Sequence, residues 1–330
     1  MSKIDAGTDD SKRVDVDHPR MQIDEPAVSV RGLTKHYGKL VAVDQLGFEI
    51  PRGVIAGFIG PNGAGKTTTL AMLLGLVRPT AGGATVLGHP IGEPAAYLGR
   101  VGALIETPAF YRSLSGRQNL ELLASVAGTE RRGVAGLLDQ VGLGDRGGDR
   151  FGAYSTGMKQ RLGIAAALLG DPDLLLLDEP TNGLDPVGKA EMRSLLGRLA
   201  RPGRSVVVSS HVLTELEQIC DWLVIIEQGR LLFQGPTSEL LTSAGARLIL
   251  APRHRHDIWR LGQLLARRGH NVESRDDHMR VAVDGTDPHH LAAELNTAAM
   301  DAGVVLAELR TAAATLEDRY LAIVAGASER

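Results

Sequence analysis

A glycine-rich segment at residues 60–67 has the residue types that bind phosphate. It fits the pattern G-x-x-x-x-G-K-[ST]. Its glycines let the backbone curl so that amide N–H groups point at a phosphate, at the positive end of the following helix. Lys66 would reach the β- and γ-phosphates, and the Thr67 hydroxyl would ligate Mg²⁺. The candidate nucleotide-binding residues are Gly60, Pro61, Asn62, Gly63, Ala64, Gly65, Lys66, Thr67 and Thr68.

Two adjacent carboxylates end an apolar run at residues 174–177. A strand of this kind places Asp178 at the carboxyl edge of a sheet, where ligands bind in open α/β folds. Asp178 would hold Mg²⁺ through water, and Glu179 would position or deprotonate the attacking water. The alternative is a strand end with two solvated acids, which a phosphate-binding loop in the same chain disfavours.

Hydropathy periodicity predicts the elements that position these groups. An apolar, β-branched run at 54–59 predicts a strand before the loop, and apolar residues spaced by three and four over 67–77 predict a helix after it. This order is typical of nucleotide-binding folds and disfavours a glycine-rich turn without a ligand. A turn is expected at 34–39. The other strands predicted in this part of the chain are at residues 27–30, 40–50, 101–105, 174–177 and 206–209.

Helical patterns predict two further regions. Amphipathic patterns at 116–127 and 132–141 predict a small helical subdomain, and a helix is expected to begin at Pro186 and end before Gly203. After about residue 245 the elements become shorter, as in a compact α/β domain. In that region strands are predicted at 247–250, 271–274, 279–283 and 303–306, and helices at 257–268, 288–302 and 314–325.

Composition limits the class of protein. The 330 residues are 43% hydrophobic and 23% charged, as in an ordinary globular protein. The net charge is −3, and residues 1–26 hold seven acidic against four basic residues, which predicts a disordered acidic leader and no broad basic face for nucleic acid. Cys220 is the single cysteine, which excludes an internal disulfide and a thiolate zinc cluster. The polar start of the chain and the short apolar runs predict a cytoplasmic protein without a membrane span.

Further motifs in a fixed order make residues 27–245 resemble the ATP-binding cassette (ABC) family. The stretch at 154–161 resembles the signature motif of that family, residues 182–186 resemble the loop after its catalytic glutamate, and residues 209–211 resemble its switch-histidine segment. The resemblance implies an α/β P-loop NTPase fold with a RecA-like core, an antiparallel β subdomain and a helical subdomain at about 107–170. A C-terminal α/β accessory domain would occupy 246–330.

The resemblance also implies roles for residues outside the phosphate loop. Tyr37 would stack on adenine, and His211 would contact the γ-phosphate within the same chain. Two such chains would clamp two ATP molecules head to tail, so that Ser155 and the Gly157 backbone would reach the ATP of the partner. Asp185 would couple the two sites across the interface.

Two departures from the family pattern stand out. Glu106 occupies the position usually held by glutamine, where a carboxylate could ligate Mg²⁺ more strongly but would repel the γ-phosphate, and would therefore alter turnover rather than abolish it. The signature motif reads Tyr-Ser-Thr-Gly-Met at 154–158. This motif and the stretch at 104–111 resemble bacterial cassettes that export antibiotics, bacteriocins or lantibiotics, as in bacitracin- or daunorubicin-type self-resistance.

By this resemblance, the chain is expected to be an ATP-hydrolysing subunit that uses ATP and Mg²⁺. It would form an ATP-dependent dimer, most simply a homodimer, and would touch the membrane only through a separately encoded permease, at the cytoplasmic face. Phe110 and Tyr111 could line the groove for that permease, or pack in the core of the helical subdomain. The alternatives are a soluble ABC-type ATPase of ribosomes or DNA repair, and an ATP-binding regulatory module. Neither tandem cassettes nor long heptad insertions are present to support the first of these.

Overall fold

A computed structural model describes residues 25–106, 109–129, 133–200, 203–242, 246–283, 287–313 and 315–328. The predicted leader therefore lies almost entirely outside the described residues. Within the described part of the chain, no helix combines the length and apolar character needed to cross a bilayer.

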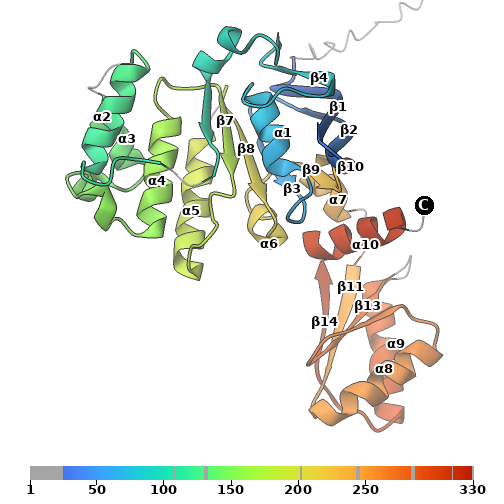
Figure 1. Ribbon diagram of the computed structural model, residues 1–330. Coiled ribbons are helices and arrows are strands. Elements are labelled where there is room, and N and C mark those ends of the chain that lie inside the picture. The colour runs from blue at the N-terminus through green and yellow to red at the C-terminus, as the bar shows by residue number, and fades with distance from the viewer. Residues whose placement is uncertain are drawn as a thin grey trace, which may run out of the picture.

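A six-stranded sheet forms the centre of the larger part of the molecule (Figure 1). Its order is β10 (Arg230–Pro236), β9 (Trp222–Glu227), β3 (Ile55–Ile59), β8 (Ser205–Ser210), β7 (Leu174–Asp178) and β6 (Val101–Leu104). All neighbouring strands are parallel except β9 and β10, which form an antiparallel pair. The strands predicted at 54–59, 101–105, 174–177 and 206–209 are confirmed as β3, β6, β7 and β8. The strands β9 and β10 were not predicted from the sequence.

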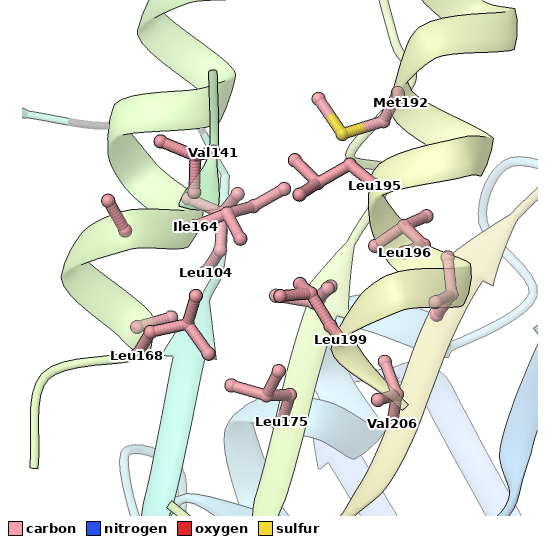
Figure 2. Close-up of a cluster of buried hydrophobic side chains, with 14 of the residues drawn as sticks. Leu104, Val141, Ile164, Leu168, Leu175, Met192, Leu195, Leu196, Leu199 and Val206 are labelled. Atoms are coloured by element: carbon pink, nitrogen blue, oxygen red, sulfur yellow. The ribbon is translucent and has the colours of Figure 1, made fainter. Parts of the chain in front are cut away.

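Alternate residues of these strands enter two different hydrophobic cores. Leu175 and Leu177 of β7 face the core that contains α4 (Thr156–Ala167) and α5 (Pro186–Leu199). Figure 2 shows part of this core, with Leu175 lying between the side chains of both helices. Leu174 and Leu176 face the opposite core. The continuous apolar runs of the sequence are thus explained by burial of the sheet on both faces.

The second core is closed by an antiparallel sheet and a helix. The sheet has the order β2 (Leu40–Ile50), β1 (Val28–Tyr37), β4 (Ala81–Val86) and β5 (His89–Pro90), and the helix is α1 (Lys66–Leu73). The prediction of a turn at 34–39 was wrong for most of this range, because β1 continues to Tyr37, which pairs with Leu40 of β2. The chain turns at Gly38, whose φ of 60° is accessible to glycine without steric cost.

Helices lie on both sides of the six-stranded sheet (Figure 1). The helical region contains α2 (Gly116–Val126) and α3 (Val134–Gln140) beside α4, and α6 (Leu213–Leu216) and α7 (Thr237–Thr242) are short. Both predicted helices at 116–127 and 132–141 are thereby confirmed in type. Single 3₁₀ turns occur at Pro94–Ala96, Leu98–Arg100, Gly144–Arg146, Phe151–Ala153 and Arg255–Asp257.

A third, antiparallel sheet begins at Ala246 and has its own core. Its order is β12 (Val272–Ser274), β13 (Met279–Ala282), β11 (Ala246–Pro252) and β14 (Leu306–Ala313). The helices α8 (Ile258–Arg267) and α9 (Pro288–Asp301) cover one face of this sheet. The strand expected at 303–306 was misplaced, since β14 starts at Leu306 and extends to Ala313. The division of the chain into domains at 245 and 246 remains a prediction.

The last helix, α10 (Leu316–Ser328), returns from the third sheet to the first core (Figure 1). Leu316 is fully buried there. Its backbone N–H donates to the Glu217 carboxylate at 3.0 Å, and Arg319 Nε donates to the Leu240 carbonyl at 3.1 Å. On the other side Asp318 forms ion pairs with arginines of β11 and β13. The helix therefore joins the third sheet to the region that follows β8.

Replacing Leu316 by alanine is expected to lower the free energy of unfolding by about 2–5 kcal/mol, because a fully buried leucine is lost from the first core. Leu321 lies on the same helix but is 49% exposed, so Leu321→Ala is the control and should change stability by less than about 0.5 kcal/mol. Urea unfolding of both variants measures the difference. Equal effects would show that α10 does not contribute to this core.

The Asp318 carboxylate makes the stability of the contact between α10 and the third sheet depend on pH. Burial by itself raises its pKa, but hydrogen bonds from Thr315 and the guanidinium groups of Arg247 at 3.2 Å and Arg280 at 3.0 Å outweigh this and hold the pKa below its usual range. A lowered pKa stabilises the fold above the unfolded-state value of about 3.9, and this contribution disappears as the pH falls through the folded-state value.

Wild type is accordingly expected to exceed Asp318→Asn in stability near pH 7, with a difference that shrinks below about pH 4. Unfolding curves recorded between neutral and acid pH test this. Glu317→Gln, which changes an exposed carboxylate on the same helical turn, serves as the control. A wild-type advantage that does not change with pH would contradict the assignment.

Candidate functional site

The glycine-rich loop joins the end of β3 to the start of α1, as the sequence predicted. Gly65 precedes the helix with a φ of 99°, a left-handed backbone that favours glycine. There is also no room for a side chain: a Cβ at Gly65 would lie 2.5 Å from the Ala42 carbonyl oxygen, and one at Gly60 would lie 2.4 Å from that of Ile226. The loop thus depends on glycine for conformation and for close approach of neighbouring strands.

Lys66 is the buried cation of the site. Its side chain is 6% exposed, and its ammonium donates to the carbonyls of Gly60 at 2.7 Å and Pro61 at 3.2 Å. The same ammonium lies 3.3 Å from Glu179 Oε1. Lys66 therefore connects the glycine-rich loop with the carboxylate pair at the end of β7.

Asp178 and Thr67 bring two oxygen ligands together. Asp178 is buried, and its Oδ2 accepts a hydrogen bond from the Thr67 hydroxyl at 2.6 Å. Its Oδ1 accepts one from the Ser209 hydroxyl. Hydroxyl and carboxylate oxygens are the hard donors that Mg²⁺ prefers. The donor set of Thr67 and Asp178 therefore fits this metal.

Glu179 follows with an unusual backbone and well-defined partners. Its φ of 48° lies in the left-handed region. Its backbone N–H donates to Ser209, to the hydroxyl at 2.9 Å and the carbonyl at 3.2 Å. Its Oε2 lies 2.8 Å from Nδ1 of His211, while Oε1 faces Lys66. Each oxygen of the carboxylate thus has a different basic partner.

A cavity of ≈470 Å³ opens above these groups. Tyr37 lies at its rim, 48% exposed, with the Lys35 ammonium 4.9 Å from its ring centroid. An exposed ring beside a phosphate-binding loop can stack on a flat base. The cavity is lined by Tyr37, Leu40, Val41, Ala42, Asn62, Gly63, Gly65, Lys66, Thr67, Thr68, Glu179, Asn182 and His211.

Three predicted residues lie elsewhere, around a second cavity of ≈550 Å³. Ser155 caps the N-terminus of α4, and Asp185 caps that of α5 by accepting from the Gly188 N–H at 2.7 Å. Gly157 lines the same cavity, as do Arg146 and Arg161. The structure therefore assembles the predicted residues other than Glu106 into two groups within one chain.

Glu106 joins neither group. It follows β6, is exposed, has a φ of 62°, and lines neither of these two cavities. Its predicted role remains a prediction. Phe110 packs edge-on against Phe151 with centroids 5.1 Å apart, whereas Tyr111 is 64% exposed. Contact of this pair with a permease stays a prediction.

Two polar residues of the site had no individual role in the sequence reasoning. Ser209 was read only as part of the histidine motif, and Asn182 only as part of a loop. Ser209 contacts the Asp178 carboxylate and the Glu179 backbone N–H, and Asn182 lines the first cavity. The available signal for Ser209 was a polar residue ending an apolar strand of a parallel sheet, at the edge where Asp178 also emerges.

Comparisons with known proteins agree with this geometry. A family model described as ABC transporter matches residues 43–182. The bacitracin transport ATP-binding protein BcrA of Enterococcus faecalis is 44% identical over 223 residues, which is 67% of this chain and 72% of that protein. The daunorubicin/doxorubicin resistance ATP-binding protein DrrA of Streptomyces peucetius is 37% identical over 233 residues, 69% of this chain and 71% of that one. A solved ATP binding subunit of an ABC transporter superimposes with a TM-score of 0.59 at 29% identity, covering 66% of this chain and 92% of that chain.

The two kinds of glycine constraint in the loop can be separated. Gly63 has a φ of 82° but nothing within 4 Å of a Cβ, whereas Gly65 combines its φ of 99° with the close Ala42 carbonyl. Gly65→Ala is expected to abolish nucleotide binding, and Gly63→Ala to cost only the backbone strain of about 1–2 kcal/mol. Titration with a fluorescent ATP analogue and thermal unfolding measure both. Equal losses in the two variants would contradict the steric argument.

Proposed function

The chain belongs to the ABC transporter family of ATP-binding subunits, and from this premise we propose that it hydrolyses Mg-ATP to drive export through a separate membrane permease. The observation that carries the proposal is the contact of Glu179 with Lys66 on one oxygen and with His211 on the other. A base, a phosphate-binding ammonium and a switch histidine are then within one hydrogen-bonded unit. Such a unit is what phosphoryl transfer to water requires.

Thr67 and Asp178 would hold the metal, and Mg²⁺ when bound would neutralise charge on the β- and γ-phosphate oxygens. The backbone N–H groups of residues 62–67 would receive the phosphates at the start of α1. Tyr37 would receive the adenine at the rim of the same cavity.

Lys66 would change partners when nucleotide binds. Its ammonium contacts the loop carbonyls and Glu179. Phosphate oxygens compete for the same ammonium, and its transfer to them would leave Glu179 Oε1 to accept a proton from the attacking water. His211 would keep the carboxylate oriented through Oε2. Nucleotide binding would in this way also free the Glu179 carboxylate from its ion pair with Lys66.

The second cavity supports a dimer. Ser155, Gly157 and Asp185 are positioned by the N-termini of α4 and α5, where the helix dipole favours an anion. In one chain they do not line the cavity that contains Lys66. A second copy facing the first head to tail would place Ser155 and the Gly157 backbone against the γ-phosphate of its neighbour, with Asp185 coupling the two sites across the interface, so we propose an ATP-dependent homodimer.

The direction and class of transport follow from the relatives. BcrA is named for bacitracin transport, and DrrA is named for resistance to daunorubicin and doxorubicin. We therefore assign this chain to export of an antibiotic, drug or peptide. Exposed Tyr111 and, on α2, exposed Leu122 and Val126 offer apolar surface to a permease.

Glu179→Gln is expected to bind ATP, shift to a dimer with Mg-ATP, and lower the rate of phosphate release at least about 100-fold, because the proton acceptor is removed. Light scattering and a phosphate-release assay on wild type and variant measure this. Glu93→Gln, at an exposed carboxylate, is the control and should match wild type. Wild type that binds Mg-ATP but releases no phosphate, with or without its permease, would favour an ATP-binding regulatory module.

A further inference from the structure

We propose that Ser209 is a positioning residue that sets the geometry of Asp178 and Glu179 together; this deepens the proposed ATPase function and rests on it. Ser209 lies on β8, directly opposite Asp178 on the neighbouring strand β7. Its side chain is fully buried, so it is not a residue that ATP itself would contact. It acts on the reaction through the two carboxylates.

The hydrogen bonds of the Ser209 hydroxyl have only one consistent direction. An ionised carboxylate can accept but not donate, so the hydroxyl proton must point at Asp178 Oδ1. The lone pairs of the same oxygen are then free to accept the Glu179 N–H at 2.9 Å. The Ser209 hydroxyl thus donates to the carboxylate of Asp178 and accepts from the backbone N–H of Glu179.

Because of the first of these hydrogen bonds, the two carboxylate oxygens of Asp178 have different partners. Oδ1 is occupied by Ser209, and Oδ2 faces the Thr67 hydroxyl at 2.6 Å. Without the Ser209 donor the carboxylate could rotate about its terminal bond, because such torsions have broad minima. We therefore expect the affinity of the site for Mg²⁺ to depend on Ser209, although Ser209 is not a ligand.

The second bond stabilises an uncommon backbone. Glu179 has a φ of 48°, a region that side-chain-bearing residues occupy only when their surroundings hold them there. Both bonds of the Glu179 N–H go to Ser209, to the hydroxyl and to the carbonyl. Losing the hydroxyl loosens this backbone, and the carboxylate would move relative to Lys66 and His211.

Ser205 provides a matched comparison within the same strand. It is 1% exposed, and its hydroxyl likewise accepts a backbone N–H, that of Gly53, at 2.9 Å. It lies at the opposite end of β8, paired with Leu174 rather than with Asp178. Ser205→Ala therefore removes a buried hydroxyl and one backbone hydrogen bond without touching the carboxylates.

The test measures kcat, KM for ATP, and the Mg²⁺ concentration that half-saturates binding of a fluorescent ATP analogue. For Ser209→Ala we expect kcat to fall about tenfold to a hundredfold, from loss of a charge-assisted hydrogen bond, with KM changed by less than about twofold and the half-saturating Mg²⁺ raised several-fold. Ser205→Ala should lower the melting temperature to a similar degree but leave all three quantities unchanged. Ser209→Thr, which keeps the hydroxyl, should recover both kcat and Mg²⁺ dependence.

A Ser209→Ala protein whose kcat and Mg²⁺ dependence match those of Ser205→Ala would overturn the proposal, as would a folded Ser209→Thr protein as impaired as Ser209→Ala. The Mg²⁺ dependence of nucleotide binding does not require turnover. If wild type released no phosphate, the proposed ATPase function would fail, while the binding comparison between the two alanine variants would still decide the role of Ser209.

Discussion

The parallel sheet imposes the constraint on which the rest of this structure depends. Both faces of its central strands are buried, and alternate residues of β7 enter one core or the other. A sheet of this kind needs helices or a second sheet on each side, which α4, α5, α1 and the antiparallel sheet provide. Because β3, β7 and β8 are parallel, their carboxyl ends meet at one edge. The phosphate loop, both carboxylates and His211 all emerge there as a consequence of packing.

Charge balance at that edge favours a divalent cation there. Lys66 and Asp178 are each only 6% exposed, and Glu179 adds a second carboxylate in contact with Lys66. This edge thus holds one buried ammonium and two carboxylates, and the ammonium contacts only that of Glu179 among the described contacts. Burying unpaired charge is costly, so the excess negative charge must be offset by hydrogen bonds or by a cation. The Thr67 and Ser209 hydroxyls supply the hydrogen bonds in this structure.

Local patterns in the sequence were sufficient where one segment determined its own structure. The phosphate loop, the strands with continuous apolar runs, and the helices at 116–127 and 132–141 needed no distant partner to be recognised. Of the missed strands, β9 reads Trp-Leu-Val-Ile-Ile-Glu and carries a local signal that was overlooked. β4 is different, because Ala-Gly-Gly-Ala-Thr-Val has little hydrophobic or β-branched character before its last two residues. It is a strand because it pairs with β1, which is distant in the sequence.

The site shows the same division. The phosphate loop and the carboxylates of β7 lie near one another as expected. The separation of Ser155, Gly157 and Asp185 from Lys66 was implied only by the family resemblance and not by any local pattern. The contacts of Ser209 depend on the register between β7 and β8, which no local pattern encodes. Glu106 was matched by position in a motif, and its exposed, left-handed backbone at the end of β6 was not predictable from its side chain.

The return of α10 to the first core has a consequence for biosynthesis. Leu316 is a fully buried member of the core that also contains Leu175 and Leu216, yet ribosomes make it only after the entire third sheet. Domains generally fold in the order of their synthesis, from the N-terminus onward. Here the surface that Leu316 covers, beside α6 and α7, stays open to solvent while β11 to β14 are still being translated. The nascent ATP-binding region must therefore remain soluble with an unfilled hydrophobic surface until the last helix leaves the ribosome.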